Sequence, residues 1–275
     1  MRATLAIVVL LTAGSVFAAD KTGFSWSNPT PDELLRPMTT DRPDATESPF
    51  TVDAGRIQIE ISFAQHTYDR HNPERSDIRV SEWNVAPVNL RVGLTHDTEL
   101  QIVVDNYLHV EERSSSGSWR QRQSGWGDVT LRLKRNLFGN DGGESALAVM
   151  PFVKIPTNSG GVGNNHFEGG LVVPASVTIG GRGFGIMTAM DLVHDGDDYT
   201  AVWLNTVTTG FELSDSLGAF VELASETGGG SHALTFNTGL TLGISENVQL
   251  DAGVNFGLTR AAPDIAVFAG ISIRL

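Results

Sequence analysis

Charged side chains recur at alternate positions between apolar ones along much of this sequence. Glu60 is flanked by isoleucines and Arg132 by leucines. Successive side chains of an extended chain point to opposite faces, so the charges share one face and the apolar groups the other. Charges of both signs on a common face can orient ionic or dipolar solutes. The candidate residues of this face are Glu60, Arg79, Arg91, Arg132, Lys134, Lys154, Glu222, Asp251 and Arg274.

The elements that position these charges must be strands. Apolar residues alternate with polar ones from Ile57 to Phe63, from Val248 to Phe256 and from Ile265 to Leu275. The alternation predicts about twelve strands, at 56–69, 77–92, 98–110, 125–137, 145–155, 170–179, 183–193, 199–212, 217–224, 232–242, 248–258 and 265–275. Many approach the length that a tilted strand needs to cross a bilayer.

The charged face of the strands distinguishes a membrane barrel from a soluble β protein. Long charged side chains in a dry core are costly unless they are paired, whereas a water-filled lumen accommodates them. Polar connections such as 111–124 and 156–169 alternate with tight ones at 180–182 and 214–216, as in outer-membrane barrels. The predicted fold is all-β, a closed antiparallel up-and-down transmembrane β-barrel.

Composition excludes several classes of function. The chain has a formal net charge of −13 and a pI near 4.9, which disfavours binding to a nucleic-acid backbone. It has no cysteine, which excludes disulfides, thiolate metal sites and thiol catalysis. Its 30 glycines favour strands and turns over long helices.

The N-terminal region divides into two parts. Residues 1–18 have a short basic start, an apolar run and Val16-Phe17-Ala18 at the end, which predicts a signal peptide cleaved after Ala18. Residues 19–54 contain five prolines, so they form a periplasmic N-terminal segment without sustained helix or central strand. Residues 55–275 form the barrel, which we expect in the bacterial outer membrane.

The polar motif Asp41, Arg42, Pro43, Asp44, Thr46 and Glu47 lies in the Pro-rich segment. One interpretation is a salt-bridged turn that caps the first strand and sets the barrel register. The alternative is a segment that folds back and constricts the lumen. The first interpretation places the motif at the periplasmic mouth of the barrel.

No catalytic constellation is evident. The seven histidines are scattered, and the sequence has no nucleophile elbow, phosphate loop or dinucleotide fingerprint. We therefore predict no enzymatic activity, no metal and no cofactor. A barrel-embedded hydrolase is kept as an alternative because outer-membrane barrels do host hydrolases, which need a Ser or Thr nucleophile, a His base and an orienting polar group.

The charged face predicts a function in transport. Arg79, Arg91, Arg132, Lys134 and Lys154 belong to the second to fifth strands, whereas Glu60, Glu222 and Asp251 come from the first, ninth and eleventh. Closing the strands would set a basic wall opposite a more acidic one. We expect a passive channel for small solutes, with aromatic or anionic compounds as candidates and outer-membrane lipids as surroundings. A non-conducting structural or adhesive barrel is the alternative.

Three segments resemble a known family. They are TDRPDATESPFTVDAGRIQIE at 40–60, VNLRVGLTHDTEL at 88–100 and GWGDVTLRLK at 125–134. They resemble a bacterial outer-membrane family of transporters labelled by the MetA pathway of phenol degradation. The resemblance covers most of the chain after residue 18. It implies an outer-membrane β-barrel with a transport role, inserted by the outer-membrane assembly machinery.

Overall fold

The computed structural model describes residues 20–72, 77–196 and 198–275. The predicted signal peptide, residues 1–18, lies outside the described residues. A short 3-10 helix, η1 (Asp32–Leu34), precedes the strands. The strands are β1 (Ile57–Asn72), β2 (Ile78–Val85), β3 (Val88–Thr95), β4 (Thr98–Val104), β5 (Tyr107–Arg113), β6 (Arg120–Gly125), β7 (Val129–Phe138), β8 (Ser145–Ile155), β9 (Glu168–Ile179), β10 (Arg182–His194), β11 (Tyr199–Glu212), β12 (Leu217–Gly228), β13 (Ser231–Ser245), β14 (Val248–Gly257) and β15 (Ile265–Arg274).

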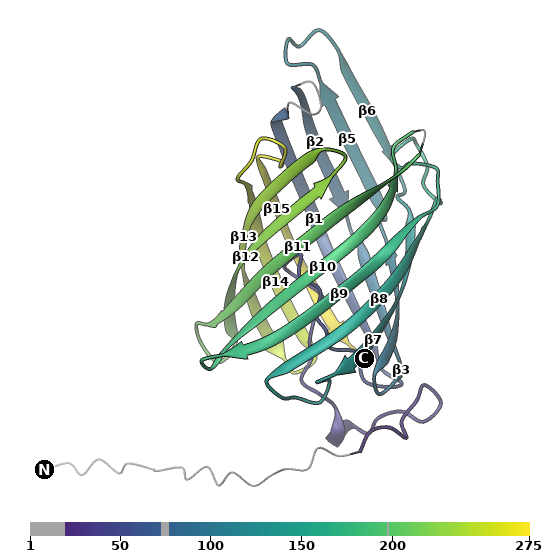
Figure 1. The fold of residues 1–275 in the computed structure, drawn as a ribbon, viewed down its shortest axis with the longest axis vertical. Helices are drawn as coiled ribbons and strands as arrows, with labels where there is room; N and C mark the ends of the chain where they lie inside the picture. Colours follow the sequence, from purple (N-terminus) through teal and green to yellow (C-terminus); the bar gives the residue numbers. More distant parts are fainter. Residues whose placement is uncertain (1–19, 73–76, 197) are drawn as a thin grey trace, which may run out of the picture.

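All strands belong to one antiparallel sheet that closes on itself. The sheet order runs from β15 back to β7 and then through β4, β3 and β1, and β1 pairs with β15 to complete the ring. The closed wall has twelve strands, as the alternation predicts. Closure gives every strand of the ring a hydrogen-bonded neighbour on both sides and leaves no exposed edge within the ring. Figure 1 shows the resulting tilted cylinder.

Three strands extend the wall beyond the ring. β1 pairs with β3 along its first part and with β2 along its second, and β2 continues through β5 to β6. Figure 1 shows β2, β5 and β6 rising above the other strands. The prediction of a loop over 111–124 is therefore wrong in part, because Arg120–Gly125 pairs with β5 as a strand. Its polar sequence does not show the apolar alternation on which the prediction relied.

The outer surface of the ring is apolar. Leu133, Leu171, Ile186, Val207 and Leu240 are each more than 40% exposed in the isolated chain. Trp83, Tyr107, Tyr199 and Trp203 are also exposed near strand ends, where aromatic residues meet the membrane interface. Phe152, by contrast, packs inside the barrel against the cluster that contains Met150 and Val172.

The two ends of the barrel differ. Tight turns at 96–97, 180–181 and 246–247 lie at the end where the C-terminus lies, whereas the longest connection, 156–167, lies at the other end. Outer-membrane barrels place short turns in the periplasm and longer loops outside. The closed wall, its apolar exterior and this asymmetry place the protein in the bacterial outer membrane. Among the described residues, no helix has the length and apolar character needed to cross a bilayer.

Candidate functional site

The chain enters its own barrel before the first strand begins. Residues 39–54, here called the lumenal segment, lie inside the wall and lead directly into β1. Figure 1 shows this purple part of the chain entering from the end that holds the C-terminus. At its last part, Val52 N donates to Glu99 Oε2 on β4 at 2.6 Å. A Cβ on Gly93 of β3 would lie 2.0 Å from the Asp53 carbonyl oxygen, so a glycine is needed for this close approach.

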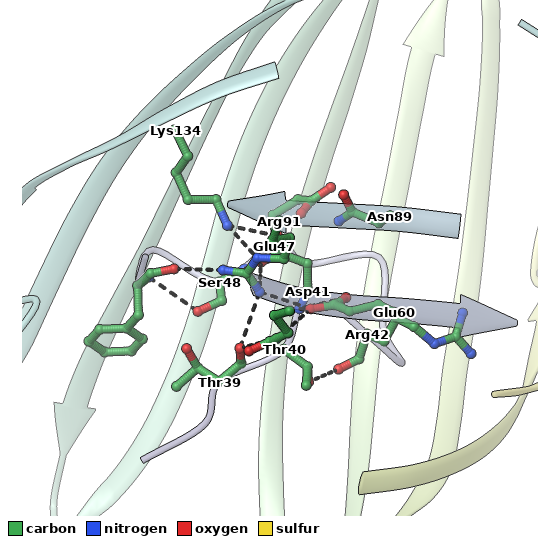
Figure 2. A network of polar contacts seen from close by, with 12 residues as sticks. Thr39, Thr40, Asp41, Arg42, Glu47, Ser48, Glu60, Asn89, Arg91 and Lys134 are labelled. Carbon is green, nitrogen blue, oxygen red and sulfur yellow. Dashed lines mark hydrogen bonds and ion pairs between the residues drawn. The ribbon is translucent and has the colours of Figure 1, made fainter. Parts of the chain in front are cut away.

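A buried ion-pair network joins the lumenal segment to one wall. It consists of Asp41, Glu60, Arg91, Glu99 and Lys134. In each of these residues a charged side-chain nitrogen or oxygen lies within 3.5 Å of a group of opposite charge. Arg91 Nη1 lies 2.9 Å from Glu60 Oε1, and Lys134 Nζ donates to Asp41 Oδ1 at 2.7 Å. Arg91 and Lys134 are 0% exposed. Figure 2 shows Glu60, Arg91 and Lys134 around Asp41.

The lumenal segment meets the opposite wall with groups of the opposite kind. Arg42 donates to both carboxylate oxygens of Asp251 on β14, at 3.2 and 2.7 Å. The Thr46 backbone N–H donates to Glu222 on β12 at 2.8 Å. On the basic side, Arg132 Nη1 lies 2.5 Å from Glu47 Oε1. The segment therefore presents carboxylates to the basic wall, and a guanidinium and N–H groups to the acidic wall.

The remaining motif residues lie between these anchors. The Arg42–Pro43 peptide bond is cis, and Pro43 and Asp44 connect Arg42 to the stretch that contacts Glu222. The Thr46 hydroxyl lies 2.6 Å from that of Thr206 on β11. The motif therefore lies inside the lumen, in contact with β1, β11, β12 and β14.

Most candidate residues from the sequence do face the lumen. The structure brings Glu60, Arg91, Arg132, Lys134, Glu222 and Asp251 into contact with the lumenal segment. Two lie apart from them. Lys154 pairs with Glu168 at 2.7 Å near the outer end, and Arg274 donates to the Arg36 carbonyl oxygen at 2.6 Å at the periplasmic mouth.

Arg79 does not face the lumen, and this prediction is wrong. The sequence predicts a single strand over 77–92, in which Arg79 and Arg91 would share a face. The chain is interrupted at Ala86-Pro87, where Ala86 has φ 54°, and β2 ends as β3 begins. The interruption reverses the phase of the side chains, so Arg79 lies on the outward face with the exposed Trp83 and Val85.

Some residues that face the lumen were not predicted from the sequence. Glu99 and Gln101 on β4 are 0% exposed, and both contact Asp41 or its partners. The same alternation that indicates Glu60 marks these two positions, since they flank Leu100. An apolar patch inside the barrel on β8 to β11 was also not predicted, because the prediction of lumenal residues relied on charged side chains. It consists of Met150, Phe152, Val172, Met187, Ala189 and Leu204.

Cavities lie on both sides of the lumenal segment. One of about 800 Å³ opens at the periplasmic end, lined by Arg36, Met38, Gln249 and Arg274 among others. A second of about 230 Å³ lies beyond the segment, lined by Arg42, Glu47, Glu60 and Arg132 among others. Arg42 and Glu47 thus stand between the periplasmic space and the upper lumen.

Serine and histidine do meet, on the outer surface. His66 and Ser81, His109 and Ser124, and Ser225 and His232 are paired at 2.6 to 3.0 Å. In the described part of the chain no carboxylate is hydrogen-bonded to these histidine rings, so the third, orienting member of a hydrolytic triad is not assembled there. The described residues contain no cluster of three or more metal-ligating side chains.

Comparison with known proteins fits this architecture. Residues 40–275 match the family described as "Putative MetA-pathway of phenol degradation". The chain belongs to this family. Its matched range begins in the lumenal segment, so the family includes the segment together with the barrel. Sequence comparison with curated proteins finds no match.

Solved structures share the fold. The COG4313 outer membrane channel from Pseudomonas putida F1 superposes with a TM-score of 0.60 at 14% identity, covering 86% of this chain and 100% of that one. The NanC porin gives a TM-score of 0.48 at 10% identity, covering 80% of this chain and 100% of that one. The first of these structures is that of an outer-membrane channel, and its superposition supports the fold of this chain.

Proposed function

We propose that the protein is an outer-membrane channel for small solutes and that its lumenal segment gates the path. The observation that carries the proposal is the charge complementarity between this segment and the two walls. Buried ion pairs contribute little net stability compared with apolar packing. Groups that stay charged on the inner face are, however, well suited to a lumen that fills with water when the segment leaves.

The contacts also indicate a class of solute. The Asp41 and Glu47 carboxylates occupy positions on Lys134 and Arg132 that a solute carboxylate could take. Glu47 N lies 3.4 Å from the Met187 sulfur, so the apolar patch adjoins this position. Arg132 Nε and Glu47 Oε2 have no hydrogen-bond partner among the described residues. A small aromatic carboxylate would place its charge on the basic wall and its ring on the patch.

A reversible lock tests the gate. The chain has no cysteine, and the Thr46 and Thr206 hydroxyl oxygens lie 2.6 Å apart, so T46C/T206C places the only two thiols side by side. In planar bilayers we expect the oxidised variant to conduct roughly fivefold less than its reduced form, because the segment can no longer leave. The single variant T46C is the matched control and should not respond to reductant.

Deletion supplies the opposite perturbation. Removing residues 20–48 takes away Asp41, Arg42 and Glu47, and the assembled barrel should then conduct more than the full chain. Assembly is checked by heat-shifted mobility on a denaturing gel. An assembled deletion variant that passes no ions would contradict the channel and favour a structural barrel. Equal conductance of the locked, reduced and deleted forms would contradict the gate.

Solute preference is measured by swelling of liposomes that contain the protein. We expect benzoate to enter roughly fivefold faster than benzylamine, which has a similar ring and the opposite charge. R132E should reduce or reverse this preference, and R135E on the outer surface should not change it. Equal rates for the two solutes would exclude selection of anions.

A further inference from the structure

Four arginines gather on the outward face of the extension above the ring. They are Arg79 on β2, Arg113 on β5, and Arg120 and Arg122 on β6, here called the outer arginine cluster. Arg79 is in register with Arg113, and Arg113 with Arg120. Neighbouring strands lie about 4.8 Å apart, so these guanidinium groups come from three adjacent strands at one level.

The cluster has a large excess of positive charge. On the outward face of β2, β5 and β6, all of them described, the one acidic side chain is Glu111, which contacts Arg113, Arg120 and Arg122. The Glu111 side chain is 14% exposed, whereas those of Arg113 and Arg122 are 51% and 55% exposed. One carboxylate therefore leaves most guanidinium donors available, in a chain whose net charge is −13.

The position of the cluster relative to the bilayer is set by the aromatic residues on the same strands. On β2, Trp83 lies four positions from Arg79, which is near the outer end of the strand. On β5, Tyr107 lies six positions from Arg113. Both aromatic side chains are exposed, as expected at the membrane interface. A strand rises about 3.3 Å per residue. The arginines therefore lie just outside the apolar band, at the level of lipid headgroups.

We infer that the outer arginine cluster binds the phosphorylated headgroup of a lipopolysaccharide molecule in the outer leaflet. Guanidinium groups bind phosphate oxygens through paired, charge-assisted hydrogen bonds. A hollow of about 350 Å³ between Tyr68, Arg79, Ser81, Glu111 and Arg113 provides room for such a group. The acyl chains would lie below it, along the face where His66 stacks on Trp83 with ring centroids 4.4 Å apart.

The test compares binding of lipid A with and without its phosphates to the purified full chain in detergent. R79Q/R113Q/R120Q/R122Q should weaken binding of bisphosphorylated lipid A by about tenfold or more. Binding of dephosphorylated lipid A should be the same for both proteins. E111Q should bind bisphosphorylated lipid A more tightly than the wild type, because the carboxylate no longer competes for Arg113, Arg120 and Arg122. Heat-shifted mobility confirms that each variant is folded.

R135Q/R182Q is the matched control, since both arginines are exposed at the periplasmic end. It should bind bisphosphorylated lipid A as the wild type does. Unchanged affinity of the quadruple variant, or an equal loss for the two lipids, would overturn the inference. Displacement of lipid A by an equal concentration of inorganic phosphate would indicate a site for free anions and would also overturn it.

Discussion

The basic side chains inside the barrel and those on its outer extension receive their counter-charges in different ways. Arg91 is 0% exposed and lies beside Asp41, Glu60 and Glu99. Arg113, Arg120 and Arg122 are exposed and share Glu111. Inside, the protein provides more carboxylates than cations. Outside, it provides fewer, so the surroundings must contribute the rest.

This difference follows from the cost of removing a charge from water. A guanidinium that is buried without partners is strongly destabilising, so the lumenal ones need carboxylates from several elements. An exposed guanidinium remains solvated, and its ion pairs contribute little to stability. Removing one member of the inner network should therefore be costly, because it leaves a buried charge without its partner, whereas the arginines of the outer cluster are available for recognition.

The largest effect should come from breaking the inner network. R91A leaves Asp41, Glu60 and Glu99 with Lys134 as their remaining cation in the network, and should lower the free energy of unfolding by about 3–5 kcal/mol. Urea titration in detergent, followed by tryptophan fluorescence, measures it. R135A removes an arginine that is 61% exposed and 3.0 Å from Asp97; its cost should stay below about 1 kcal/mol. Similar costs for the two variants would remove the contrast.

An intermediate effect is expected where the lumenal segment approaches the wall. G93A introduces a Cβ 2.0 Å from the Asp53 carbonyl oxygen, so the segment or β3 must shift, at about 1–3 kcal/mol. Conductance should also rise, because the docked segment is held less firmly. G183A is the control, since nothing lies within 4 Å of its Cβ. A G93A protein as stable as G183A would show that the docked segment contributes little.

The smallest effect on stability should come from the outer cluster. In detergent without lipopolysaccharide, R113Q/R120Q/R122Q should change the free energy of unfolding by no more than about 0.5 kcal/mol. With bisphosphorylated lipid A present, the wild type should gain stability and the variant should gain less, because ligand binding stabilises the folded state. A large loss in the absence of lipid would mean that these arginines are structural, like Arg91.

Much of the barrel could be predicted from the sequence, because lipid on one side and water on the other impose a strict alternation on each strand. Ile59, Glu60 and Ile61 show the pattern directly, and it also marks Arg132, Lys134 and Asp251. Twelve strands, the polar interior and the outer-membrane location follow from it. The alternation is local, so it survives uncertainty about which strands are neighbours.

The tertiary structure alone decided which charges meet and on which face of the extension they lie. Asp41 and Lys134 are 93 residues apart in the chain, and Arg42 and Asp251 are 209 apart, so no spacing rule could pair them. The interruption at Ala86-Pro87 reverses the side-chain phase of β2 relative to β3 and places Arg79 on the outward face. Side chains in a strand alternate with a period of two, so a single irregular residue is enough to move the following side chains from the lumenal face to the lipid-facing one.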